Sequence, residues 1–299
     1  MKKQVLKILL LGVLLIFACM LPVNASDANV SLNASKTELY AGETFTVMLN
    51  AQCADGINGL STVVSYDTTN LELVSSEIVD TTKWFNLGEN LSFDIIHYAS
   101  GTETSAGLLK LTFKVKATAT ESTTAKITAS NVKLDSDASS NSMKEIGTKE
   151  VEVSILEKLN VSISDYEEQK EGTKLYINKI NIGTLIGALK DKIETNGLVK
   201  IFKDNVEVLA TNIKLATGME IRISLNNENL TYKTVVKGDT DGDGEATFTD
   251  ILQINKHRLN KASLTNEFLK AGDITADGVA DFMDILQINR YRLGKINSL

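Results

Sequence analysis

Two acidic stretches near the C-terminal end of the chain carry side-chain oxygens at regular intervals. The first is a twelve-residue loop with aspartate at positions 1, 3, 5 and 12 and glycine at position 6: Asp239, Asp241, Asp243, Asp250 and Gly244. A turn at such a glycine brings alternate side chains and one backbone carbonyl onto a single point. Glu245 at position 7 would contribute that carbonyl, and Thr247 at position 9 would act directly or through a water molecule.

The second loop repeats this arrangement with one change. Its aspartates stand at positions 1, 5, 9 and 12: Asp273, Asp277, Asp281 and Asp284. Thr275 replaces an acid at position 3, and Val279 would contribute the carbonyl at position 7. Asp281 at position 9 brings the number of carboxylates in this loop back to four, so each loop offers four carboxylates to one ion.

Four converging carboxylates need a cation. Two carboxylates about 4 Å apart repel each other by roughly 4 kcal/mol at an effective dielectric constant of about 20, and a divalent ion offsets that repulsion. An oxygen-only set of ligands, with neither histidine nor cysteine, favours Ca²⁺ over zinc or copper, so we expect two calcium ions. The alternative is a pair of solvated acidic turns, which the repetition of the loop disfavours.

The loops belong to an internal repeat with an offset of 34 residues, in which 250–261 returns as 284–295 with nine of twelve residues identical. Apolar residues recur at helical spacing after each loop: Ile251, Leu252, Ile254 and Leu259, then Ile285, Leu286, Ile288 and Leu293. This spacing predicts one helix leaving each loop. A strand over 232–236 runs into the first loop, and no amphipathic helix is expected to enter either loop, so the loops are EF-hand-like rather than full EF-hands.

Paired loop–helix units of this kind over 238–295 resemble type I dockerin domains. The resemblance implies an all-α domain with paired calcium loops that binds the cohesin domain of a scaffold protein in a cellulosome, a complex for polysaccharide catabolism. It also implies contacts to the cohesin from loop positions 10 and 11 and from basic residues on the helices that follow: Phe248, Thr249, Lys256, Arg258, Phe282, Met283, Arg290 and Arg292. Core packing of the two phenylalanines is the alternative.

Between about residues 30 and 156 the hydrophobic pattern has a period of two. Apolar and polar residues alternate over 44–51, 109–117 and 150–155, which predicts strands with one buried face. Glycine-containing turn signals recur between these stretches, so an antiparallel β-sandwich is expected.

Two stretches of this sandwich resemble cohesins. Residues 66–73 are similar to a cohesin signature, with Thr68 in place of its proline, and 109–116 is similar to a later cohesin strand. The resemblance implies a jelly-roll sandwich, related in fold to carbohydrate-binding modules, and a dockerin-bearing enzyme as partner. Many type I cohesins bind the dockerin through an Asn and an Asp on one strand. The corresponding residues of this sequence are 59–61, which are Gly-Leu-Ser.

Residues 159–237 contain both the strand-like and the helix-like hydrophobic period. Thr184 is placed to cap a helix with Ile186, Leu189 and Ile193 on its apolar face, ending at 196–197. A hairpin is expected over 199–209 with its turn at 204–205, and further strands over 221–225 and 232–236. We therefore expect a small α+β module without a site of its own.

The first 25 residues have the pattern of a secretory signal peptide. Three lysines precede an apolar run over 8–20, and small residues at 23–25 form a cleavage site. The run is too short for a membrane span, so a secreted, extracellular protein is expected, with a lipoprotein anchored at Cys19 as the alternative. Without the signal peptide Cys53 is the only thiol, so no internal disulfide is expected.

The composition agrees with a multidomain globular protein. The 299 residues are 43% hydrophobic and 23% charged. The net charge of −7 excludes the positive field typical of nucleic-acid binders. We expect a signal peptide over 1–25, a cohesin-like β-sandwich over 27–156, a small α+β module over 159–237 and a type I dockerin over 238–299.

These domains predict a secreted, non-catalytic adaptor that joins partners through calcium-dependent binding between dockerins and cohesins. The alternative is a carbohydrate-binding component that its dockerin delivers to polysaccharide, with Trp84 and Phe85 as candidate stacking residues. An enzyme is the least favoured class, because His97 and His257 belong to no catalytic pattern.

Overall fold

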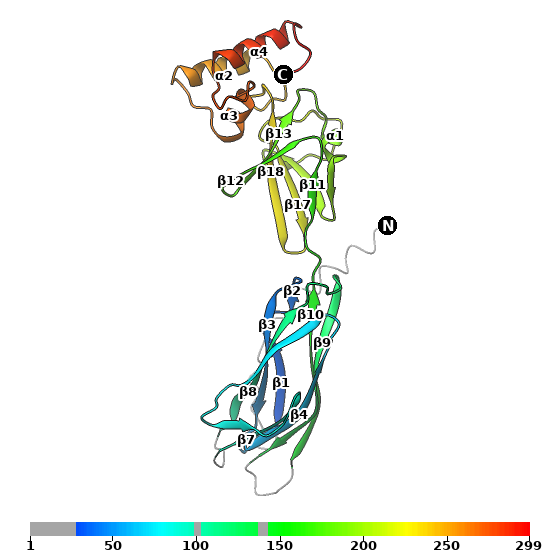
Figure 1. The fold of residues 1–299 in the computed structure, drawn as a ribbon. Coiled ribbons are helices and arrows are strands. Elements are labelled where there is room, and N and C mark those ends of the chain that lie inside the picture. The colour runs from blue at the N-terminus through cyan, green and yellow to red at the C-terminus, as the bar shows by residue number, and fades with distance from the viewer. Residues whose placement is uncertain (1–27, 99–102, 137–142) are drawn as a thin grey trace. The chain divides into compact units, whose positions relative to one another are not determined.

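The computed structural model describes residues 28–98, 103–136 and 143–299, which fall into two compact units divided between Leu156 and Glu157 (Figure 1). The predicted signal peptide and Cys19 lie outside the described residues. No helix in the described part of the chain is both long and apolar enough to cross a membrane.

The N-terminal unit is a sandwich of two sheets, as the alternating pattern predicts. Its strands are β1 (Asn29–Ala34), β2 (Glu38–Leu39), β3 (Thr44–Gln52), β4 (Gly59–Tyr66), β5 (Leu71–Ile78), β6 (Trp84–Asn86), β7 (Ser92–His97), β8 (Ser105–Val115), β9 (Thr123–Asp135) and β10 (Lys144–Ile155). One sheet has the order β1-β3-β8-β5 and the other the order β2-β10-β9-β4-β7-β6. All described pairings within this unit are antiparallel except the short parallel contact between β10 and β2.

The period of two places one face of each long strand in the core. In β3 the four apolar residues of the alternation are buried: Phe45, Val47, Leu49 and Ala51. In β8 the alternation holds up to Val115, where the strand ends, and Ala117 beyond it is exposed. The core therefore lies between the two sheets, and the apolar side chains of the two inner faces fill it.

The C-terminal unit begins with a second β-rich region. Its elements are β11 (Val161–Ile163), β12 (Glu167–Glu171), β13 (Lys174–Ile180), α1 (Ile186–Lys190), β14 (Ile193–Thr195), β15 (Leu198–Lys203), β16 (Val206–Glu207), β17 (Glu220–Leu225) and β18 (Glu228–Val236). Six strands form a sheet in the order β12-β13-β18-β17-β15-β16, and β11 pairs with β14. The predicted hairpin turn is confirmed, since Asp204 and Asn205 both have positive φ angles between β15 and β16.

The helix predicted in this region is mostly wrong. Helix α1 has five residues, and its N-cap is Leu185 without a side-chain hydrogen bond. The hydroxyl of Thr184 instead donates to the carbonyl of Asn181. Ile193 lies in β14, where pairing with Ile163 of β11 replaces the last turns of the expected helix.

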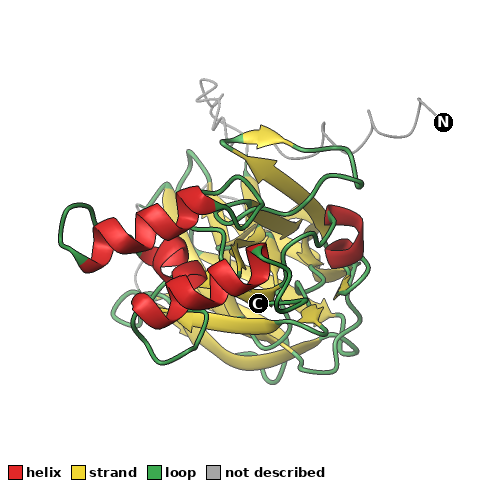
Figure 2. Ribbon diagram, turned by 90° about the horizontal axis from the view of Figure 1, so that it is seen from above, coloured by secondary structure: helices red, strands yellow, loops and turns green. Residues whose placement is uncertain are grey.

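The end of the chain contains α2 (Phe248–Arg258), α3 (Asn266–Gly272) and α4 (Phe282–Arg292). Figure 2 shows these three helices gathered together, with the short α1 apart from them. Helices α2 and α4 are the two predicted exit helices. Helix α3 corrects the expectation that no helix enters either loop, because it ends at Gly272, directly before Asp273 of the second loop.

The helical region packs on the six-stranded sheet within the same unit. Tyr176 of β13 and Val235 of β18 form one buried cluster with Ala271 of α3. Ile182 packs against the buried residues of both regions. The residues predicted as separate α+β and dockerin domains therefore share a continuous apolar contact.

Candidate metal centre and partner-binding face

The first acidic loop follows strand β18 almost directly. The strand ends at Val236, and Asp239, the first residue of the loop, comes three residues later. Carboxylate oxygens of Asp239, Asp241 and Asp243 lie within 4.8 Å of one another. Gly244 at loop position 6 has a φ angle of 89°, the left-handed conformation that the predicted sharp turn requires. Three of the four acids that the spacing predicts as ligands in this loop therefore lie close together.

Asp239 is fully buried, and backbone amides surround its carboxylate. Its Oδ1 accepts hydrogen bonds from the amides of Gly242 at 2.7 Å and Asp243 at 3.1 Å. Its Oδ2 accepts from Gly244 at 3.1 Å and from Thr217, outside the loop, at 2.7 Å. Burial nevertheless raises the pKa of Asp239 to about 6, because desolvation disfavours the charged form of a carboxyl group.

The acids at position 12 have a second role that the loop spacing did not indicate. Asp250 and Asp284 are both fully buried at the third position of their helices. Asp250 accepts from the amides of Thr240 and Thr247, each at 2.7 Å. In the second repeat, Asp284 accepts hydrogen bonds from the amides of Ile274 and Asp281, each at 2.8 Å. These carboxylates tie the start of each loop to the start of the helix that leaves it.

The residues at position 9 cap the exit helices. The Thr247 side chain accepts from the amide of Thr249 at 3.0 Å, and Asp281 accepts from Met283 at 2.6 Å. Together with the acids at position 12 they form a capping box in both repeats. The sequence carries the signal for this capping box, which is a Thr or Asp followed three residues later by an acid.

The second loop is more open than the first. Asp273 accepts hydrogen bonds from the amides of Asp277 at 3.0 Å and Gly278 at 2.9 Å, both within the loop. Asp277 accepts from Val279, and the Thr275 hydroxyl lies 3.1 Å from Asp284. Across the described residues, the first loop alone brings three acidic side chains within ligand distance of one another. Metal binding at the residues named stays a prediction for both loops.

The oxygen atoms of the first loop suit a hard cation. The three clustered carboxylates form an oxygen-only donor set, which is the kind of set that Ca²⁺ prefers. The side chain of Glu245 at position 7 turns away to an ion pair with Lys214. A calcium ion there would supply the positive charge that offsets repulsion among the acids.

The predicted partner-binding residues form an exposed surface on α2 and α4. Phe248 is 63% exposed and Phe282 is 59% exposed, so the alternative of core packing is wrong for both. The Arg292 guanidinium lies 5.7 Å from the centre of the Phe248 ring, which brings the two repeats together. Thr249, Arg258, Met283 and Arg290 are also exposed, and Lys256 is half-buried.

Three weaker candidates have structural roles. Trp84 is only 1% exposed and packs its ring against His97, so it offers no platform for a sugar. His257 accepts a hydrogen bond from the amide of Leu264 beside α2. Cys53 is a free, buried thiol.

Solved structures similar to this chain are cohesins. The sixth cohesin of scaffoldin B from Acetivibrio cellulolyticus, in complex with a Cel5 dockerin mutant, is 16% identical, covers 42% of this chain and 99% of its own, and has a TM-score of 0.35. The seventh type I cohesin of ScaB from Pseudobacteroides cellulosolvens is 22% identical over 44% of this chain and 94% of its own, with a TM-score of 0.34. No curated protein matches the chain.

Two family models match separate parts of the chain. The model of the cohesin domain matches residues 29–155, the described sandwich. The model of the type I dockerin domain matches residues 237–293, which contain both acidic loops and both exit helices. The chain therefore carries an N-terminal cohesin domain and a C-terminal type I dockerin domain.

Proposed function

We propose that the chain is a secreted, non-catalytic adaptor with two docking surfaces. The dockerin would bind a cohesin of a scaffold protein, while the chain's own cohesin would receive a dockerin-bearing enzyme. The observation that carries the proposal is the exposed pair Phe248 and Phe282 on a dockerin that shares its chain with a cohesin. Cohesins and dockerins are non-catalytic modules typical of extracellular cellulosome components, which agrees with export by a signal peptide.

Calcium would hold the dockerin surface in place. Type I dockerins bind calcium, and we assign one ion to each loop, with the side-chain and carbonyl ligands predicted from the spacing. The acids of each loop are tied through Asp250 or Asp284 to the helix that carries the exposed phenylalanine. Filling the loops would therefore fix the positions of Phe248 and Phe282 relative to each other.

The receiving surface of the cohesin would be the face of β4, β7 and β6. Phe85 of β6 pairs with Ile96 of β7, which in turn pairs with Gly59 of β4. The ring of exposed Tyr98 lies 4.7 Å from the ring of Phe85, and Ile96 and Leu87 are also exposed. Residues 59–61 read Gly-Leu-Ser where many type I cohesins carry an Asn and an Asp that contact the dockerin. An apolar receiving face suits a dockerin that presents aromatic or aliphatic anchors.

The proposal is tested by measuring binding of the full chain to arrays of cohesins and dockerins in calcium. Replacing Phe248 and Phe282 together by alanine should weaken cohesin binding by about tenfold or more, since exposed aromatic anchors dominate such interfaces. Tyr98→Ala should weaken only dockerin binding. Leu209→Ala, at an 80% exposed position outside both surfaces, is the control. Retention on polysaccharide, with no dockerin bound by the wild-type chain, would contradict the adaptor function.

A further inference from the structure

A turn of the β-rich region lies against the first calcium loop. This turn, residues 216–219, precedes β17, and its Thr217 amide donates to Asp239 Oδ2 at 2.7 Å. The backbones of the turn and the loop also approach each other closely at Gly242, because a Cβ atom added there would lie 3.0 Å from the Thr217 carbonyl oxygen. A Cβ atom at Gly244 would lie 3.1 Å from the Leu215 carbonyl oxygen. The turn and Leu215, which directly precedes it, thus cover one side of the loop.

Two lysines of the same region also reach the first loop. Lys203 Nζ donates to the carbonyl of Gly242 at 3.0 Å, and Lys214 forms an ion pair with Glu245. Both cations come from outside the sequence matched by the dockerin family model. The loop is therefore contacted at positions 1, 4 and 7 by the β-rich region.

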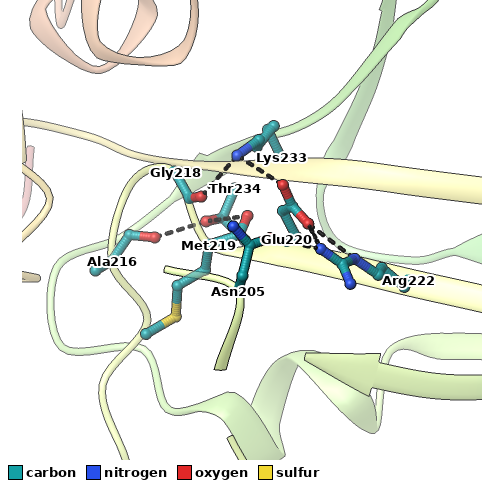
Figure 3. Close-up of polar contacts among 8 residues, drawn as sticks. All are labelled: Asn205, Ala216, Gly218, Met219, Glu220, Arg222, Lys233 and Thr234. Carbon is teal, nitrogen blue, oxygen red and sulfur yellow. Dashed lines mark hydrogen bonds and ion pairs between the residues drawn. The ribbon is translucent and has the colours of Figure 1, made fainter. Parts of the chain in front are cut away.

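The turn is itself fixed to the sheet. Figure 3 shows the Thr234 hydroxyl of β18 between two carbonyls of the turn, 2.6 Å from Ala216 O and 3.2 Å from Met219 O. The backbone of Thr234 adds hydrogen bonds of 3.0 Å to Gly218 and to Met219. Lys233 Nζ donates to the Gly218 carbonyl at 3.2 Å. A turn held at this many points keeps the Thr217 amide in position.

The second loop receives no comparable support from the described residues. Amide donors to Asp273 come from Asp277 and Gly278, inside the loop. A Cβ atom at Gly278 would meet nothing within 4 Å, whereas its counterpart Gly244 is buried. The two loops therefore have similar ligands but different surroundings.

We infer that residues 216–219 complete the first calcium loop and make it bind Ca²⁺ more tightly than the second. A loop whose position 1 carboxylate is already ordered loses less conformational freedom when the ion enters. Thr217 is accordingly a positioning residue for the metal site, acting through Asp239. This inference rests on the proposed occupancy of both loops by calcium.

One other difference between the loops has to be separated from this effect. The second loop has Thr275 at position 3, while Asp281 at position 9 keeps its number of carboxylates at four. A test that alters only loop ligands could not distinguish the two causes. Substitutions in the turn can, because they leave every loop residue unchanged.

The experiment is calorimetric titration of the calcium-depleted full chain with Ca²⁺. We expect two classes of site, with Asp241→Asn abolishing the tighter class and Asp277→Asn the weaker one. Thr217→Pro, which removes the amide donor, should weaken the tighter class by about tenfold or more and leave the other unchanged, since hydrogen bonds to charged groups are the strong ones. Thr217→Val keeps the amide and controls for loss of the hydroxyl.

A second variant guards against a local folding defect in Thr217→Pro. Thr234→Val keeps the Thr217 amide but releases the turn, and should weaken the tighter class by a smaller factor than Thr217→Pro. Thr231→Val, at an exposed position of the same strand, should change neither class. Equal affinities in the wild-type chain, loss of the tighter class in Asp277→Asn, or equal weakening of both classes by Thr217→Pro would overturn the inference. A total of one ion per chain would instead contradict the proposed occupancy.

Discussion

Glu220 of β17 lies between two cations on neighbouring side chains. Its carboxylate is 2.8 Å from Arg222 Nε and 3.1 Å from Lys233 Nζ (Figure 3). The hydrogen bond from Arg222, followed by that from Lys233, lowers the pKa of Glu220 below its ordinary value of 4.5. A carboxyl group with a lowered pKa in the folded state contributes stability above its unfolded pKa, and that contribution is lost as the pH falls through the folded value.

The free energy of unfolding of the C-terminal unit should therefore decrease as the pH falls below about 4.5, and Glu220→Gln should make that decrease shallower. Thermal unfolding followed by circular dichroism at a series of pH values measures both slopes. Glu194→Gln, at an exposed position, is the matched control and should keep the wild-type slope. Identical slopes for wild type and Glu220→Gln would show that this carboxylate does not contribute.

Single-residue roles at the metal loops were only partly predictable. The spacing of Asp239, Asp241 and Asp243 was sufficient to indicate their convergence, because a loop turn at Gly244 fixes it locally. The Thr217 contact to Asp239 was not predictable, since it joins residues 22 positions apart through tertiary packing. Sequence patterns describe short-range geometry well and carry no such information on packing between regions.

Among the elements, the two exit helices depend on their capping boxes. Thr247 is the N-cap of α2, and its side chain accepts from the Thr249 amide. Thr247→Ala should lower the free energy of unfolding of the C-terminal unit by about 1 kcal/mol in saturating calcium. The change is measured as a shift in urea-induced unfolding followed by circular dichroism.

The control for this variant comes from the third helix. Thr265 is the N-cap of α3 but makes no side-chain capping hydrogen bond. Thr265→Ala should therefore have less effect than Thr247→Ala. A larger effect at Thr265 would mean that the capping box does not stabilise α2.

The elements that sequence analysis missed are those that tertiary contacts impose. Helix α3 has seven residues, too few for a clear helical period, and is held by contacts such as Lys270 with Glu171 and the Tyr176 ring. The expected long helix after Thr184 is shortened because Ile193 joins a strand pair. Long alternating strands and the exit helices were predictable since their own patterns span several turns or strand repeats.

Across the whole molecule, the acidic loops and the single tryptophan lie in different units. Trp84 is buried in the sandwich, while both loops lie beyond Glu157. Tryptophan fluorescence therefore reports unfolding of the N-terminal unit alone, and helical circular dichroism reports the C-terminal unit. The two signals can be followed in one sample of the full chain.

Chelation of calcium should lower the unfolding temperature seen by circular dichroism and leave the fluorescence transition unchanged. A ligand at about one hundred times its dissociation constant stabilises the folded state by about 2.7 kcal/mol per site, and this contribution disappears with the ion. The loss should extend beyond the helices into the β-rich region, because Thr217 and Ile182 connect that region to the dockerin. Protection of the amides of β17 and β18 against hydrogen exchange measures this spread. If those amides keep their protection while α2 and α4 lose theirs, the two regions unfold independently despite their shared contact.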